Sequence, residues 1–222
     1  MQKRGDAMMK KNRTAAEQGM EARRRVHAGE NEQERLLKGV FAGVFAALTF
    51  VVFTYLSIRI PTPGGGQVSV HLGNALVVLG ALLLGGFYGG AAGALGLAIA
   101  DLLDPAYIVE APITFLIKFS IGLIVGLIAH RIGHITREND KKKVMLWVLL
   151  SSAVGLGFNA VFDPLLRYGY KILILGRPMA EVSFAVNFVV TLINSVVSLI
   201  LVAALYWALR VPLGKAGLFF RL

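Results

Sequence analysis

The chain has 222 residues, of which 56% are hydrophobic and only 16% charged, and its mean hydropathy is +0.67. These values exclude an ordinary soluble globular domain. The chain has no cysteine, which excludes disulfides, thiolate metal sites and cysteine nucleophiles.

The net charge is +10, and ten of the 23 basic residues lie between Lys3 and Lys38. Most of the others flank apolar runs, so the charge indicates membrane topology and no nucleic-acid partner is expected. We predict a basic, polar N-terminal tail over residues 1–36, a transmembrane domain over 37–210 and a short basic tail over 211–222.

Six apolar runs within residues 37–210 are long enough to cross a bilayer as helices. They do not alternate with period two, which argues against a β-barrel. The sequence therefore predicts an all-α integral membrane protein with a bundle of about six transmembrane helices. The expected spans are 38–58, 70–86, 87–105, 111–131, 144–165 and 182–209.

The loops predict the orientation, because cytoplasmic connections of membrane proteins collect lysine and arginine. The loop 130–143 is strongly basic, whereas 59–69 and 104–110 are poor in basic residues. Arg167, Lys171 and Arg177 after the fifth span oppose this pattern. The best fit is a multi-pass protein of the cell membrane with both termini cytoplasmic.

Polar residues within the spans gather in the predicted outer halves, while the inner halves are almost wholly apolar. Polar groups in hydrocarbon are costly unless they pair or line a wet cavity. We therefore expect a shared pocket open to the outside, and no channel through the chain. The candidate substrate-binding residues are His71, Asn74, Asp101, Lys118, Asn159, Asn187 and Asn194.

Each candidate also has a structural interpretation. Lys118 and Asp101 could form an ion pair without touching a ligand, and His71 could be a solvated helix end. Asp163, which precedes Pro164, is interpreted as helix-end chemistry. Two asparagines could instead form hydrogen bonds between membrane helices: Asn187 and Asn194.

The first outer loop is expected to be a mobile lid over the pocket, with a plain connector as the alternative. Its candidate gating residues are Pro63, Gly64, Gly65, Gly66 and Gln67. The first span carries small residues on one face, which allow close approach of a helix from this chain or from another membrane subunit. These candidate partner-interface residues are Ala42, Gly43, Ala46 and Ala47.

Residues 40–210 resemble the substrate-binding S components of energy-coupling factor (ECF) transporters, nearest to the riboflavin or hydroxymethylpyrimidine type. The resemblance is carried by His71-Leu-Gly-Asn-Ala, Leu82-Leu-Leu-Gly-Gly, Gly89-Gly-Ala-Ala-Gly-Ala-Leu-Gly, Ala100-Asp-Leu-Leu, Ala111-Pro-Ile-Thr and Ile117-Lys-Phe. One departure is Asn74, which stands where the family's HLGD-like sequence has a carboxylate.

The resemblance implies capture of a vitamin or its precursor, such as riboflavin, pyridoxine or hydroxymethylpyrimidine. It also implies a transmembrane coupling subunit, contacted by the small residues of the first helix, and two ATPase subunits. No GxxxxGK[ST] sequence is present, so ATP hydrolysis is assigned to partners. We expect no catalytic residues, metal or cofactor. The alternatives are a self-sufficient secondary transporter and, less favoured, an intramembrane enzyme.

Overall fold

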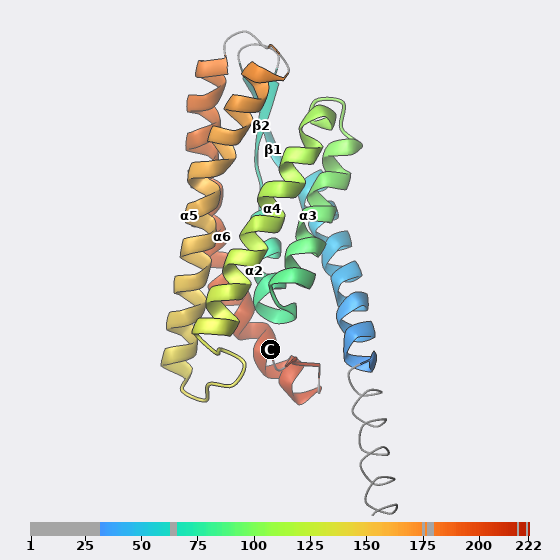
Figure 1. Cartoon of the computed structure of the whole chain (residues 1–222), viewed down its shortest axis with the longest axis vertical. Coiled ribbons are helices and arrows are strands. Elements are labelled where there is room, and N and C mark those ends of the chain that lie inside the picture. The colour runs from blue at the N-terminus through green and yellow to red at the C-terminus, as the bar shows by residue number, and fades with distance from the viewer. Residues whose placement is uncertain (1–31, 63–65, 175, 177–179, 217, 221) are drawn as a thin grey trace, which may run out of the picture. The chain divides into compact units, whose positions relative to one another are not determined.

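The computed structural model describes residues 32–62, 66–174, 176, 180–216, 218–220 and 222. Most of the expected N-terminal tail, residues 1–31, lies outside this part. The contacts discussed below belong to the unit from Phe41 to Leu222. The first helix is Glu32–Tyr55. It is followed by two strands, β1 (Ile58–Thr62) and β2 (Gly66–Val70), and by helices α2 (Gly73–Leu84) and α3 (Gly86–Leu102). The later elements, also shown in Figure 1, are the 3₁₀ turn η1 (Ile108–Glu110), α4 (Ala111–Gly126), the π-helical turn η2 (Leu127–Ile132), α5 (Lys141–Leu173) and α6 (Ala180–Lys215).

Four helices of the described part are long and apolar enough to cross a membrane. They are Glu32–Tyr55, Ile108–Ile132, Lys141–Leu173 and Val182–Lys215. The remaining two are shorter: at 1.5 Å per residue, α2 extends about 18 Å and α3 about 26 Å. The predicted bundle of about six helices is thus present, but α2 and α3 are shorter than ordinary spans.

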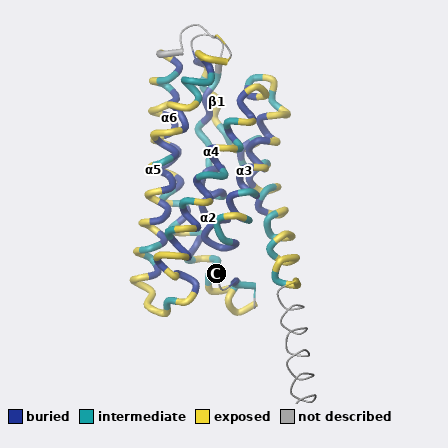
Figure 2. The backbone as a smooth tube through the Cα atoms, viewed as in Figure 1, coloured by how far each residue is buried: buried dark blue, intermediate teal, exposed yellow. Residues whose placement is uncertain are grey.

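The short α2 is the most enclosed helix of the fold. Eleven of its twelve residues are buried, as the dark tube in Figure 2 shows. The expected span at 70–86 began too early, because Gly66–Val70 form β2 and α2 begins only at Gly73. Extended backbone at this depth is tolerated where protein encloses it or where it lines a cavity.

The prediction of an all-α chain was wrong at the first loop, which forms a β-hairpin. Strands β1 and β2 pair antiparallel, with Ile58 opposite Val70 and Ile60 opposite Val68. Of the five predicted gating residues, Gly66 and Gln67 belong to β2, while Pro63, Gly64 and Gly65 lie outside the described residues. The hairpin lies at the opposite end of this unit from Leu222 (Figure 1).

Glycines bring α2, α3 and α4 into backbone contact. A Cβ atom added to Gly89 of α3 would lie 2.0 Å from the carbonyl carbon of Gly80 in α2. One added to Gly122 of α4 would lie 2.2 Å from the Cα atom of Gly90. The turn between α2 and α3 also needs a glycine, since Gly85 has φ +89°. These helices therefore pack through their backbones.

Both C-terminal helices extend past their expected ends. Helix α5 continues through Pro164 to Leu173, and α6 continues through Pro212 to Lys215, inside the segment expected as a tail. After α6 the chain reaches Leu222, whose carbonyl accepts a hydrogen bond from the Thr136 hydroxyl at 2.9 Å. The extension of α5 matters for function, because it carries two further charged residues into the protein interior.

The small residues of the first helix divide between two environments. Ala42 and Ala46 are half-buried and pack against the core. A Cβ atom on Gly96 of α3 would lie 2.4 Å from the Ala46 carbonyl oxygen. Gly43 and Ala47 are exposed, and a Cβ atom on Gly43 would meet nothing within 4 Å. Only this second pair is open to another subunit.

Candidate functional site

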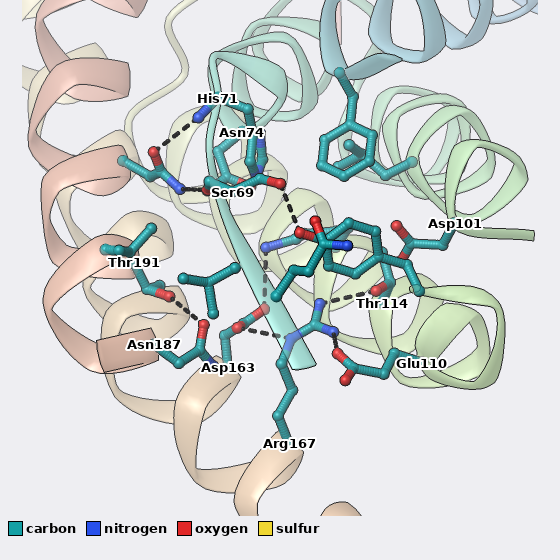
Figure 3. Close-up of a pocket in the computed structure, with 18 of the residues that line it drawn as sticks. Ser69, His71, Asn74, Asp101, Glu110, Thr114, Asp163, Arg167, Asn187 and Thr191 are labelled. Carbon is teal, nitrogen blue, oxygen red and sulfur yellow. Dashed lines mark hydrogen bonds and ion pairs between the residues drawn. The ribbon is translucent and has the colours of Figure 1, made fainter. Parts of the chain in front are cut away.

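A polar cavity lies next to the hairpin, between the first helix, β2 and helices α2 to α6 (Figure 3). Its volume is ≈ 50 Å³. The polar and charged residues around it are Gln67, Ser69, His71, Asn74, Asp101, Tyr107, Glu110, Thr114, Lys118, Asp163, Arg167, Lys171, Asn187, Thr191 and Asn194, and the apolar ones are Phe53, Val68, Leu97 and Val190.

Six of the seven predicted binding residues line this cavity: His71, Asn74, Asp101, Lys118, Asn187 and Asn194. Gln67 from the predicted gating loop also lines it. Asn159 does not line it, but its side-chain oxygen accepts from the Lys118 ammonium at 2.7 Å. The fold thus brings together polar residues far apart in sequence, such as Ser69 and Asn194, which are 125 positions apart.

The Lys118 ammonium is buried and has two polar partners on α5. Besides Asn159, it contacts the Asp163 carboxylate at 3.2 Å, and both charged side chains are 5% exposed. The ion pair considered between Lys118 and Asp101 is therefore replaced by one with Asp163. Asp163 is not a helix-end residue, because α5 continues past it and its carboxylate faces the cavity.

Arg167 connects three elements around the site. Its Nε donates to Asp163 at 3.0 Å, and its Nη2 donates to the Thr114 hydroxyl of α4 at 2.8 Å. Its Nη1 pairs with Glu110 of η1. Figure 3 shows the guanidinium between these partners. Charge-assisted bonds to a planar guanidinium fix orientation as well as distance, so Arg167 holds η1 and α4 against α5.

Lys171 extends the same network one helical turn further. Its ammonium lies 3.3 Å from Glu110 and donates to the Ser183 hydroxyl of α6 at 3.2 Å. The sequence reasoning missed Glu110, Arg167 and Lys171, because it placed them in loops. A signal was present nevertheless: four polar residues of α5 follow one another at intervals of four, which places them on one helical face. They are Asn159, Asp163, Arg167 and Lys171.

Asn194 of α6 anchors the end of β2. Its side-chain oxygen accepts from the His71 backbone amide at 3.0 Å, and its nitrogen donates to the Ser69 carbonyl at 2.9 Å. No further strand pairs with β2 on the side away from β1 in the described part of the chain. The two bonds from Asn194 therefore satisfy backbone groups that would otherwise be buried unpaired. Asn194 thus bonds to the end of β2, and not to another membrane helix as considered.

An aromatic group closes the cavity on the side of the first helix. The rings of Phe53 and His71 meet edge to face at 4.9 Å, and Phe53 lies 6.1 Å from Tyr107. The Tyr107 and Ser69 hydroxyls share a hydrogen bond of 2.7 Å. Burial raises the pKa of the Tyr107 hydroxyl, which keeps it protonated. The group offers flat apolar surface and one polar edge.

Two asparagines retain polar capacity toward the cavity. The Asn74 side-chain oxygen is buried and has no hydrogen-bond partner among the described residues. Asn187 accepts a long hydrogen bond of 3.4 Å from Thr191, one turn along the same helix. A buried acceptor without a partner costs about 1–3 kcal/mol. Asn74 therefore offers an acceptor that a bound donor would satisfy.

The cavity is lined by equal numbers of positively and negatively ionisable side chains. Three cations, Lys118, Arg167 and Lys171, face three carboxylates, Asp101, Glu110 and Asp163. No group of three or more acidic or histidine side chains in the described part is placed to hold a metal ion. The site therefore offers hydrogen bonds and an aromatic surface with little net charge.

Three comparisons relate this chain to known proteins. A family model described as "ECF-type riboflavin transporter, S component" matches residues 35–211. An "Uncharacterized protein in gap 3'region" from Pyrococcus woesei is 38% identical over 76 residues, which are 34% of this chain and 49% of that protein. The match thus spans about half the length of that relative. A structure described as "Structure and mechanism of the S component of a bacterial ECF transporter" is 18% identical, with a TM-score of 0.49 over 82% of this chain and 98% of that one.

Proposed function

Because the chain belongs to the S components of ECF transporters, and is thus the substrate-binding subunit of such a transporter, we propose that its cavity captures a small, flat, uncharged vitamin or vitamin precursor from outside the cell. The observation that carries the proposal is the polar cavity. It joins an aromatic group, the free acceptor of Asn74 and a balanced set of charges.

The balance of charge favours an uncharged ligand over a phosphate ester. Each cation around the cavity already has a carboxylate partner, so a phosphate would bring a buried charge without compensation. Riboflavin, which the matching family description names, is the first candidate. Pyridoxine and hydroxymethylpyrimidine also combine a flat ring with polar edges and remain alternatives.

We expect polar side chains of the cavity to orient the ring of the bound ligand. Asn74 would accept from a ring N–H, while Asn187 and Lys118 would meet ring oxygens or hydroxyls. His71 and Phe53 would pack against the ring. These residues lie on four helices and, for His71, on the connection between β2 and α2, so one ligand would contact most of the bundle at once.

The cavity must widen to admit such a ligand, since ≈ 50 Å³ is well below the roughly 300–1,000 Å³ of small-molecule sites. The hairpin is the element that would move. Two interactions hold it to the segment after α3: the ion pair of Arg59 with Asp104 at 2.8 Å and the bond of Ser69 with Tyr107. The hairpin thus takes the role expected of a lid.

The proposal predicts loss of ligand affinity on Asn74→Leu with little loss of fold stability, because the lost oxygen has no partner in the described structure. Binding of riboflavin, pyridoxine and hydroxymethylpyrimidine to the purified protein is measured by calorimetry, after mass spectrometry of any copurified molecule. We expect one of these three compounds to bind the parent protein, and to bind the Asn74→Leu variant at least tenfold more weakly. A comparison of riboflavin 5′-phosphate with riboflavin tests the expectation that a phosphate ester binds more weakly than an uncharged ligand.

The matched control is Asn139→Leu, at an exposed position outside the cavity. Lys118→Ala and Asn187→Ala give a further check on the assignment, because both side chains line the cavity. If all three cavity variants bind the identified vitamin like the parent protein, the binding site lies elsewhere.

The transmembrane coupling subunit, which would work with two ATPase subunits, is proposed to dock on the exposed small face of the first helix. Gly43→Trp is expected to abolish copurification of the coupling subunit, because the bulky ring blocks close helix approach. Leu150→Trp, at another exposed apolar position, is the control and should copurify normally. Normal recovery of the complex with Gly43→Trp would place the docking face elsewhere.

A further inference from the structure

A second cavity lies at the other end of the fold, around the end of α4 and the turn between α2 and α3. Its volume is ≈ 650 Å³, much larger than that of the first cavity. It is lined by Gly85, Gly86, Phe87, Leu123, Gly126, Leu127, His130, Arg131, His134, Arg137 and Leu222. This is the end at which Leu222 lies, away from the hairpin (Figure 1).

The lining has an apolar part and a basic part. Phe87, Leu123 and Leu127 present exposed apolar side chains, with exposed fractions of 65%, 41% and 59%. Arg131 and Arg137 are also exposed and follow them toward the loop 133–140. The cavity therefore combines a hydrocarbon-like wall with two guanidinium groups at its polar end.

These two arginines have no carboxylate partner in the described part of the chain. The nearest acid in sequence, Glu138, is engaged elsewhere. Its carboxylate accepts from the Asn139 and Asp140 backbone amides, each at 2.9 Å, and these bonds, that of Asp140 first, lower its pKa. The arginines are thus available to an external anion.

The backbone fixes the position of this basic end. After α4 the chain makes the π-helical turn η2, and His134 then takes a φ of +45°, an uncommon angle for a residue with a side chain. The Arg137 amide donates to the His134 carbonyl at 2.9 Å. Trp147 of α5 packs so closely on Gly133 that a Cβ there would lie 2.6 Å from its ring. The turn is therefore held against α5.

We propose that this cavity binds an anionic phospholipid, with its phosphate on Arg131 and Arg137 and an acyl chain along Leu123, Leu127 and Phe87. A soluble phosphate would use only the basic end and leave the apolar wall uncovered. A lipid satisfies both parts, and basic pockets between membrane helices are known to suit anionic headgroups. The site is separate from the polar cavity and does not depend on the proposed vitamin.

Fluorescence of Trp147 provides the test, since the chain has two tryptophans and Trp207→Phe leaves Trp147 alone. The full chain is reconstituted in phosphatidylcholine vesicles with increasing fractions of brominated phosphatidylglycerol. We expect quenching to saturate at a low fraction of the anionic lipid. Each basic side chain is worth about fivefold in affinity, so R131Q/R137Q should weaken the preference roughly 25-fold.

The control variant K141Q/K142Q removes the same charge from exposed positions outside the cavity. It should keep the preference, and thermal unfolding should verify that both variants fold. An equal loss in both variants would show general surface attraction, and no loss in R131Q/R137Q would exclude the site. Displacement of the lipid by millimolar glycerol phosphate in detergent would show a soluble ligand and also overturn the proposal.

Discussion

Replacement of Arg167 by methionine is expected to abolish ligand capture and to lower the free energy of unfolding by about 3–5 kcal/mol. The guanidinium is the shared partner of Glu110, Asp163 and Thr114, which lie on three elements. Its removal leaves Asp163 with Lys118 alone and Glu110 with Lys171 alone. With Asp101 included, three carboxylates then line the cavity with only two cations, Lys118 and Lys171.

Chemical unfolding in mixed micelles measures the stability, and calorimetry with the identified vitamin measures binding. Arg59→Met is the matched control, because Arg59 also pairs with a carboxylate but its side chain is 44% exposed. Exposed pairs contribute about 1 kcal/mol or less. Arg167→Lys should recover part of the loss by restoring the charge without the planar fork. Equal effects of Arg167→Met and Arg59→Met would contradict the role assigned to the network.

The sequence predicted the helices well because a membrane imposes a simple rule: backbone polar groups must be satisfied within the segment. The polar residues could be grouped for the same reason, since a buried Lys118 or Asn194 needs partners. The sequence could not tell which partners they find. Lys118 meets Asp163 instead of Asp101, because pairing depends on how α4 and α5 are rotated against each other.

Pro164 misled the prediction of the fifth span. A proline removes one helical hydrogen bond, and the charged residues after it are typical of a loop. Helix α5 nevertheless continues to Leu173, because Arg167 and Lys171 find Glu110 on η1 and so remain paired within the protein. The spacing of four along α5 indicated that these charged residues share one helical face. It could not show that Glu110 lies opposite that face.

The hairpin was beyond prediction for another reason. Its strands are five residues each, and the sequence Pro63-Gly64-Gly65 between them is typical of a loop. What holds β2 at cavity depth is the Asn194 side chain, from a helix 123 residues away. Such a long-range contact leaves no local pattern, so the sequence did not predict the hairpin, and its role as a lid stays a prediction.

Replacement of Gly89 by alanine is expected to destabilise the fold by about 3 kcal/mol or more, at the upper end of the cost of overpacking. The added Cβ would lie 2.0 Å from the Gly80 carbonyl carbon and 2.2 Å from the Ala81 nitrogen. Backbone atoms cannot rotate aside, so α2 and α3 must separate. Because α2 carries Asn74 and α3 carries Asp101, the cavity would widen and ligand affinity would fall together with stability.

Gly157→Ala is the matched control, since Gly157 also lies within a helix but has nothing within 4 Å of an added Cβ. It should leave stability unchanged or raise it by up to about 1 kcal/mol, the intrinsic preference of a helix for alanine. Thermal unfolding followed by tryptophan fluorescence compares the two variants. If Gly89→Ala unfolds like Gly157→Ala, α2 and α3 are not in backbone contact, and the position assigned to Asn74 in the cavity loses its support.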